Sequence, residues 1–226
     1  MGCWRCSIGT AIAPPGCFEL LVVLISGRGS NLQALLDAGL PVAAVVSNRE
    51  DAAGLALAAG RGIATAVVEH RSYSSRENFD AALAKTIDRY APRLVALAGF
   101  MRVLTPGFVE RYAGRLLNVH PSLLPAFPGL DTHARALSAG VKVHGCTVHL
   151  VTAELDHGPI VIQAAVRVRN DDDAQSLAAR VLKQEHVIYP RAARWFLDKR
   201  LVIENGRVHV KGKNAGEDAQ LIVAAD

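Results

Sequence analysis

The feature that most constrains the fold of this chain is an alternation between short apolar runs and helical stretches. The first run, LVVLI at 21–25, is apolar at every position, which is typical of a strand buried on both faces. Similar runs recur up to residue 120, and repeated strand–helix–strand units predict a parallel, doubly wound, Rossmann-like α/β sheet. We expect strands at 21–25, 42–46, 65–68, 94–98 and 116–119, and helices at 32–38, 51–60 and 75–90.

The chain changes character after residue 120. Pro121, Pro125 and Pro128 predict a long loop of the kind that often carries function. Two β segments at 147–151 and 160–168 lie close together in the sequence, so we expect them to be antiparallel. The sheet is therefore predicted to be mostly parallel, with an antiparallel C-terminal portion.

The expected domain covers residues 20–201. A long helix at 173–198 closes it, and the segment around Asn205-Gly206, within 202–226, is either a small hairpin or a tail. Residues 1–19 make a poor signal peptide, because both the charged region and the apolar run are weak. We interpret them as a disordered extension or the result of a misplaced start.

Charge and hydropathy exclude several kinds of partner. The formal net charge of +4 is too small for a nucleic-acid footprint, and no basic stripe with interleaved aromatic residues accompanies it. No apolar run reaches the roughly 18 residues of a membrane-spanning helix. A small anionic substrate fits this composition better, and we expect a cytoplasmic protein without nucleic-acid or membrane partners.

Three of the four cysteines lie in the first 17 residues. Cys3 and Cys6 form a CxxC pair, but no second pair or histidine cluster lies nearby at the spacing of a zinc site. We therefore expect no zinc there, and we expect deletion of residues 1–18 to leave stability and activity unchanged. Cys146 is interpreted as structural.

The turn after the first strand has the sequence GRGS at 27–30. Glycine permits the turn and lets an anion approach the backbone, while the N-terminus of the following helix attracts a phosphate. Ser30 or Asn31 could cap this helix and add a side-chain donor. A dinucleotide-binding loop would instead need a glycine in place of Leu32 and an acidic residue in place of Ser47-Asn48. A purely structural turn is the third alternative.

The stretch LNVHPSLLP at 117–125 is the most informative part of the sequence. Asn118 and His120 fall on the same side of a strand, at its C-terminal end, where open α/β sheets bind ligands. Pro121 keeps His120 extended. An amide beside an imidazole suits a carbonyl that becomes an oxyanion, because both groups can donate hydrogen bonds. The alternative is a histidine that ends a core strand and bonds a backbone carbonyl.

A second polar motif, HLVTAELDHGP, occupies positions 149–159 between the two antiparallel segments. If its Asp156 carboxylate lies next to His120, it favours the charged imidazole and can relay a proton through one water molecule. The spacing makes this pairing plausible without proving it, and Asp156 alone is more often a turn residue.

The chain resembles the glycinamide ribonucleotide formyltransferases of de novo purine biosynthesis over about residues 21–201. The likeness rests on SGRGSNLQ at 26–33, AGFMRVL at 98–104, NVHPSLLP at 118–125 and ELDHGP at 154–159. The third motif is common to the wider formyltransferase superfamily, whereas the first is narrower and indicates the purine enzymes. The resemblance implies the formyltransferase fold, 10-formyltetrahydrofolate as co-substrate, a phosphorylated glycinamide riboside as substrate, and no metal or nicotinamide.

The resemblance also implies the catalytic residues. Asn118 and His120 would flank the formyl carbonyl, and Asp156 would keep His120 protonated and help to move protons. Direct attack of the substrate amine on the formyl carbon is the implied reaction.

Binding roles follow from the same resemblance. The substrate would be bound by Gly29, Ser30 and Asn31 at its phosphate and by Glu185 at its ribose or amine. The folate would be bound by Arg76, Met101, Arg102, Val103, Leu104, Asn118, Thr152, Ala153, Glu154, Leu155 and Asp156. Taken alone, Met101 could be core filler and Arg102 a solvated charge, while His133, His144 and His149 are expected to be structural.

The sequence departs from the family pattern at two positions. Leu182 replaces an expected polar contact to the substrate sugar, and Asp131 replaces an expected histidine. These departures put peripheral contacts in doubt and leave the chemistry intact. As in the resembling family, the Leu124–Pro125 peptide is expected to be cis.

Three other functions compete with this interpretation. A formyltetrahydrofolate deformylase would use the same three side chains, but it carries an additional N-terminal domain, for which we expect no room before residue 20. A methionyl-tRNA formyltransferase would need a C-terminal RNA-binding domain, which the short segment after Leu201 does not supply. A non-catalytic nucleotide-binding module would have no use for Asn118, His120 and Asp156 together.

Overall fold

A computed structural model describes residues 20–212 and 220–224 of the chain. The expectations for residues 1–19, including those for Cys3 and Cys6, lie outside these described ranges.

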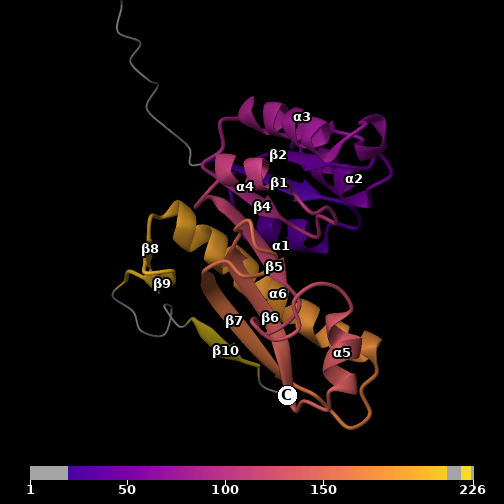
Figure 1. Ribbon diagram of the computed structural model, residues 1–226, viewed down its shortest axis with the longest axis vertical. Helices are drawn as coiled ribbons and strands as arrows, with labels where there is room; N and C mark the ends of the chain where they lie inside the picture. The colour runs from indigo at the N-terminus through magenta and orange to yellow at the C-terminus, as the bar shows by residue number, and fades with distance from the viewer. Residues whose placement is uncertain (1–19, 213–219, 225–226) are drawn as a thin grey trace, which may run out of the picture.

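The described residues form an eight-stranded sheet in the order β10-β7-β6-β5-β4-β1-β2-β3 (Figure 1). Strands β1 to β5 run parallel, β6 is antiparallel to both β5 and β7, and β10 lies parallel to β7 at the edge. The predicted mixed α/β sheet is therefore confirmed. Its strands are β1 (Leu21–Ile25), β2 (Val42–Ser47), β3 (Ala64–Val67), β4 (Leu94–Leu97), β5 (Leu116–His120), β6 (Val143–Leu150), β7 (Ile160–Arg167) and β10 (Leu221–Val223).

Helices cover both faces of the sheet and create two apolar layers. Alternate residues of β1 face opposite ways: Leu21, Val23 and Ile25 join the layer that includes α1 and α6, and Val22 and Leu24 join the layer that includes α3 and α4. This double covering explains the fully apolar first strand. The helices are α1 (Ser30–Asp37), α2 (Ala53–Gly60), α3 (Arg76–Asp88), α4 (Pro106–Arg111), α5 (Thr132–Ser138) and α6 (Ala174–Leu197), with a 3₁₀ turn at His70–Ser72.

The long helix α6 is anchored at its start and in its interior. Asp173 and Ser176 form a reciprocal capping box at its N-terminus. Farther along, the buried Tyr189 hydroxyl lies within hydrogen-bonding distance of two backbone carbonyls, 2.9 Å from that of Leu97 on β4 and 3.2 Å from that of Leu117 on β5. These contacts hold α6 across the strands that carry the site. None of the helices in the described ranges is both long and apolar enough to cross a membrane.

The segment around Asn205-Gly206 is a hairpin, and not the tail that was the alternative. It joins β8 (Leu201–Glu204) to β9 (Arg207–Val210), and both turn residues have positive φ, as a tight hairpin turn requires. The Leu124–Pro125 peptide is cis, as expected.

Candidate active site

The site is built on the C-terminal half of β5 and on the strand beside it. Asn118 lies directly opposite His149 of β6, and His120 lies opposite Thr147. Opposed residues of antiparallel strands place their side chains on the same face of the sheet. Four polar side chains are thereby gathered on one face, next to the proline-rich loop.

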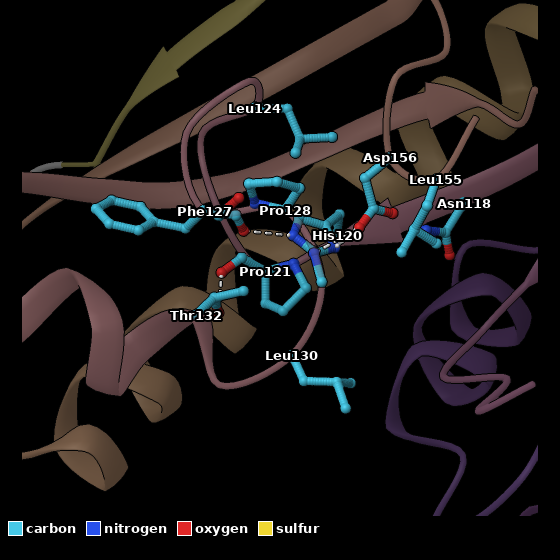
Figure 2. A network of polar contacts seen from close by, with 12 residues as sticks. Asn118, His120, Pro121, Leu124, Phe127, Pro128, Leu130, Thr132, Leu155 and Asp156 are labelled. Carbon is cyan, nitrogen blue, oxygen red and sulfur yellow. Dashed lines mark hydrogen bonds and ion pairs between the residues drawn. The ribbon is translucent and has the colours of Figure 1, made fainter. Parts of the chain in front are cut away.

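His120 lies between two hydrogen-bond acceptors and is only 5% exposed. Its Nε2 donates to the Phe127 carbonyl oxygen at 3.0 Å, and its Nδ1 lies 3.5 Å from Oδ2 of Asp156, as Figure 2 shows. A neutral imidazole has one N–H, whereas the charged ring has a hydrogen on each nitrogen. These surroundings are therefore complementary to the imidazolium form.

Asp156 reaches this position from the loop between β6 and β7. Its backbone is left-handed, with φ of 56°, and its carboxylate is 8% exposed. Oδ2 accepts the backbone N–H of Gly129 at 2.8 Å, and Oδ1 lies 3.9 Å from Nε2 of His149. The structure thus brings together Asn118, His120 and Asp156. The backbone of Asp156 does have a turn conformation, as the alternative interpretation expected, but its side chain faces His120.

His149 orients the Asn118 amide, a relationship that the sequence reasoning missed. Burial lowers the pKa of His149, so the ring is neutral near pH 7. Its Nδ1–H donates to the Leu150 carbonyl at 3.1 Å, which leaves Nε2 to accept from Nδ2 of Asn118 at 3.2 Å. One N–H of Asn118 is used in this contact, and the other remains available to a ligand.

The predicted phosphate loop has a different cap from the one expected. Gly29 is the N-cap of α1 with φ of 79°, and no described side chain caps this helix. The expectation that Ser30 or Asn31 caps it was wrong, because the left-handed Gly29 itself turns the chain into the helix. The loop also packs closely on α2: a Cβ built on Gly29 would lie 2.8 Å from Cα of Gly54.

Asn31 and Glu185, both predicted to bind substrate, are direct partners. Nδ2 of Asn31 donates to Oε2 of Glu185 at 2.7 Å, and Oδ1 of Asn31 is buried without a hydrogen-bond partner among the described residues. Burial raises the pKa of Glu185, and the bond from Asn31 partly offsets this effect. The phosphate loop and α6 therefore meet at a buried pair of polar side chains.

Apart from Asn118 on β5, the residues predicted to bind folate lie on two loops and one helix start. Met101 is 74% exposed, so the core-filler alternative for it was wrong. Its backbone N–H donates to Oγ of Ser26 at 2.8 Å, which ties this loop to the end of β1. Arg102 stacks over the ring of Phe79, 5.7 Å from its centroid, while Arg76 is exposed at the first turn of the same helix, α3.

The loop after β6 supplies the remaining predicted folate residues. Thr152, Ala153, Glu154 and Leu155 are all exposed, and Leu155 lies beside Asn118 and Asp156 in Figure 2. Val151, just before them, packs on the same apolar layer as Leu104. The loops 101–104 and 152–156 therefore border the same apolar layer of the core.

The two departures from the family pattern occupy peripheral positions. Asp131 is exposed and is the N-cap of α5 with φ of 55°, and Leu182 is half-buried on α6. Among residues 20–212 and 220–224, no group of three or more histidine, cysteine, aspartate or glutamate side chains could hold a metal ion.

The sequence pattern of the formyl transferase family matches residues 20–193 of the chain. The chain is 51% identical over 199 residues to the phosphoribosylglycinamide formyltransferase of Escherichia coli, covering 85% of this chain and 94% of that protein.

Solved structures agree with the sequence comparison. Glycinamide ribonucleotide transformylase 1 from Symbiobacterium toebii is 47% identical, with a TM-score of 0.85 over 91% of this chain and 100% of its own. A formyltetrahydrofolate deformylase from Pseudomonas syringae is 27% identical, with a TM-score of 0.80 over 86% of this chain and 66% of its own.

Proposed function

The chain belongs to the formyl transferase family, and we propose that it transfers the formyl group of 10-formyltetrahydrofolate to the amine of glycinamide ribonucleotide. This reaction is a step of purine biosynthesis. The observation that carries the catalytic part of the proposal is His120, buried between the Phe127 carbonyl and the Asp156 carboxylate beside the Asn118 amide.

Asn118 and His120 stabilise the charge that develops during the transfer. As the amine nitrogen bonds to the formyl carbon, the carbonyl electron pair moves onto oxygen. The second N–H of Asn118 is free to donate to this oxyanion. The 3.5 Å separation between Nδ1 of His120 and Asp156 exceeds the usual hydrogen-bond length, so the Nδ1–H is not taken up fully by the carboxylate and can be shared with the same oxygen while the ring keeps its place. Preorganised donors of this kind stabilise the transition state more than the substrate.

Asp156 keeps the charge on His120 and relays protons. The attacking amine must lose a proton, and the leaving N10 of the folate must gain one, so the transfer consumes no net acid or base. A carboxylate beside the imidazolium supports its charged form, and one water molecule between Asp156 and the amine would complete the relay.

The remaining residues bind the two substrates. The backbone of Gly29, Ser30 and Asn31 at the start of α1 holds the phosphate, and Glu185 meets the ribose or amine. The folate lies across the loops 101–104 and 152–156. The substrates are small molecules, and the reaction needs no metal. We place the protein in the cytoplasm.

Transfer is tested against hydrolysis in one assay. The structural likeness to a deformylase favours hydrolysis of the same folate as the second candidate function. The purified full chain is given 10-formyltetrahydrofolate with and without glycinamide ribonucleotide, and both formylated product and free formate are measured. Product that depends on the amine supports transfer. Formate released at the same rate with or without the amine would assign the hydrolytic function instead.

A further inference from the structure

A row of side chains crosses the sheet beside His120. In the sheet register, His120 of β5 faces Thr147 of β6, and Thr147 faces Gln163 of β7. Directly opposed residues share a face, so the three side chains lie in line on the face that carries the site. Gln163 is two strands away from His120 and is half-buried.

Thr147 and Gln163 hold the backbone of the loop that follows His120. The Thr147 hydroxyl donates to the Ser122 carbonyl at 2.7 Å, and it accepts from the Leu124 N–H at 3.0 Å and from Nε2 of Gln163 at 3.0 Å. Nε2 of Gln163 also donates to the Leu124 carbonyl at 2.9 Å. A hydroxyl has one hydrogen and two lone pairs, so these three contacts use the full hydrogen-bonding capacity of the Thr147 hydroxyl.

The loop returns to His120 three residues after Leu124. The Ser122 hydroxyl closes it by donating to the Ala126 carbonyl at 2.6 Å. The next residue, Phe127, provides the carbonyl that accepts from Nε2 of His120 at 3.0 Å. A shift of the backbone at Leu124 therefore moves the acceptor that fixes the His120 ring.

We propose that Gln163 is a positioning residue for His120, acting through Thr147 and the loop 121–127. The proposal rests on the proposed function, because it takes His120 to be catalytic. Gln163 touches no reacting atom. Its two donors hold the Leu124 carbonyl and the Thr147 hydroxyl, and these hold the Phe127 carbonyl against Nε2 of His120. That contact keeps a hydrogen on Nε2 and leaves Nδ1 to face Asp156.

Gln220 provides a matched control variant. It is also half-buried, it directly precedes β10, and its Nε2 donates to the carbonyls of Val161 at 2.9 Å and Val208 at 3.1 Å. Neither carbonyl belongs to the loop after His120. Gln163→Met and Gln220→Met therefore remove the same amide and the same number of side-chain donors, one from β7 and the other from the residue before the adjacent strand β10.

The test compares these variants in the full chain by kinetics, thermal unfolding and ¹⁵N NMR of the His120 ring without substrate. For Gln163→Met we expect kcat to fall about 10-fold to 10²-fold, since a misplacement near 1 Å is enough for such a loss. Both KM values should stay close to those of the wild type, and the Nδ1 and Nε2 chemical shifts of His120 should change. Gln220→Met should lower the melting temperature similarly while kcat and the His120 shifts are retained.

A second pair keeps the test decisive if Gln163→Met does not fold. Thr147→Ser retains the hydroxyl, so its kcat and His120 chemical shifts should match those of the wild type. Thr147→Val removes the hydroxyl, so its kcat should fall and its His120 chemical shifts should change. Unchanged His120 shifts in the folded variants that lack the amide or hydroxyl overturn the proposal. So does a loss of kcat that is equal in the two methionine variants and follows their loss of stability. If the shifts move as expected but the wild type transfers no formyl group, the proposed function fails and the positioning role stands.

Discussion

Oδ2 of Asp156 lies 3.5 Å from Nδ1 of His120 and accepts the Gly129 N–H at 2.8 Å. The Phe127 carbonyl on the other side of the imidazole belongs to the same loop as Gly129. One loop therefore positions both members of the pair, holding the ring through a carbonyl and the carboxylate through an N–H. The geometry of this pair depends on how the loop is held, not only on the two side chains.

Replacing Asp156 with Asn should reduce formyl transfer by about 10²–10⁴-fold, the usual loss when a positioned acid–base group is removed. The amide keeps an oxygen for the Gly129 N–H, but it removes the charge that supports the His120 imidazolium. Binding of both substrates should change much less, because the charge matters most in the transition state. Steady-state kinetics and ligand titration measure the two effects separately. Near-normal turnover in this variant would show that His120 works without the carboxylate.

Replacing Asn118 with Ala should lower kcat by about 10²–10³-fold, as expected for the loss of one oxyanion donor. His149 holds the amide in place from the neighbouring strand, so the donor is preorganised before substrate binds. Asn170→Ala, at an exposed position after β7, is the control and should keep kcat. If kcat survives in Asn118→Ala and only the KM for folate rises, Asn118 binds the folate without stabilising the oxyanion.

A side chain at Gly29 should damage the phosphate loop, whereas one at Gly27 should be tolerated. Gly29 has φ of 79°, and its Cβ would come within 2.8 Å of the Gly54 backbone, while a Cβ on Gly27 meets no described atom within 4 Å. Left-handed backbone costs an alanine roughly 1–2 kcal/mol before any clash. We therefore expect Gly29→Ala to lower the melting temperature and to raise the KM for the phosphorylated substrate more than that for folate. Gly27→Ala should unfold like the wild type, and equal melting temperatures in the two variants would contradict the close packing on Gly54.

Most strands could be predicted well because a buried apolar run ends at a change of pattern, but β6 begins at Val143 and not at the predicted residue 147. The run at 21–25 coincides with β1, and the helix predicted at 173–198 differs from α6 only by its two capping residues. Helices α4 and α5 were missed because six or seven residues are too few for a helical period to stand out. The three-residue strand β10 carries even less pattern and forms only beside β7.

The catalytic side chains could be named from the sequence, but not the contacts that hold them. Asn31 and Glu185, which are hydrogen-bond partners, lie 154 positions apart in the sequence, and no local pattern links them. His149 meets Asn118 only in one register of β5 and β6, and a shift of one residue would turn it to the other face. Two of the groups around the His120–Asp156 pair are backbone atoms, of Phe127 and Gly129, which leave no signature in residue types.

Stability should fall as the pH drops from about 6.5 toward 4, and His144 should account for a measurable part of the loss. Burial lowers the pKa of His144 to about 4; His133 faces it at 3.2 Å, and both His133 and His120 oppose its charge. The unfolded chain binds a proton at an ordinary histidine value near 6.5, so below that pH it takes up more protons than the folded chain and stability declines. The contribution is complete above pH 6.5 and is lost as the pH falls to the folded value.

Buried groups elsewhere also change the stability with pH, so the effect of His144 is isolated by comparing the wild type with a His144 variant. Burial lowers the pKa of His133, His149 and His186, which adds to the loss of stability in acid, while burial raises the pKa of Glu185, which opposes it. His144→Gln removes the His144 titration together with its interaction with His133. Between pH 6.5 and pH 5 the wild type should lose roughly 1.6 kcal/mol more than this variant, because one pKa unit corresponds to about 1.4 kcal/mol and the unfolded histidine is already half protonated at pH 6.5. Urea unfolding of both proteins at the two pH values measures the difference, and each protein serves as its own reference for the stability lost by the substitution itself. Equal losses in the two proteins would mean that His144 takes up its proton in the folded state as readily as in the unfolded chain.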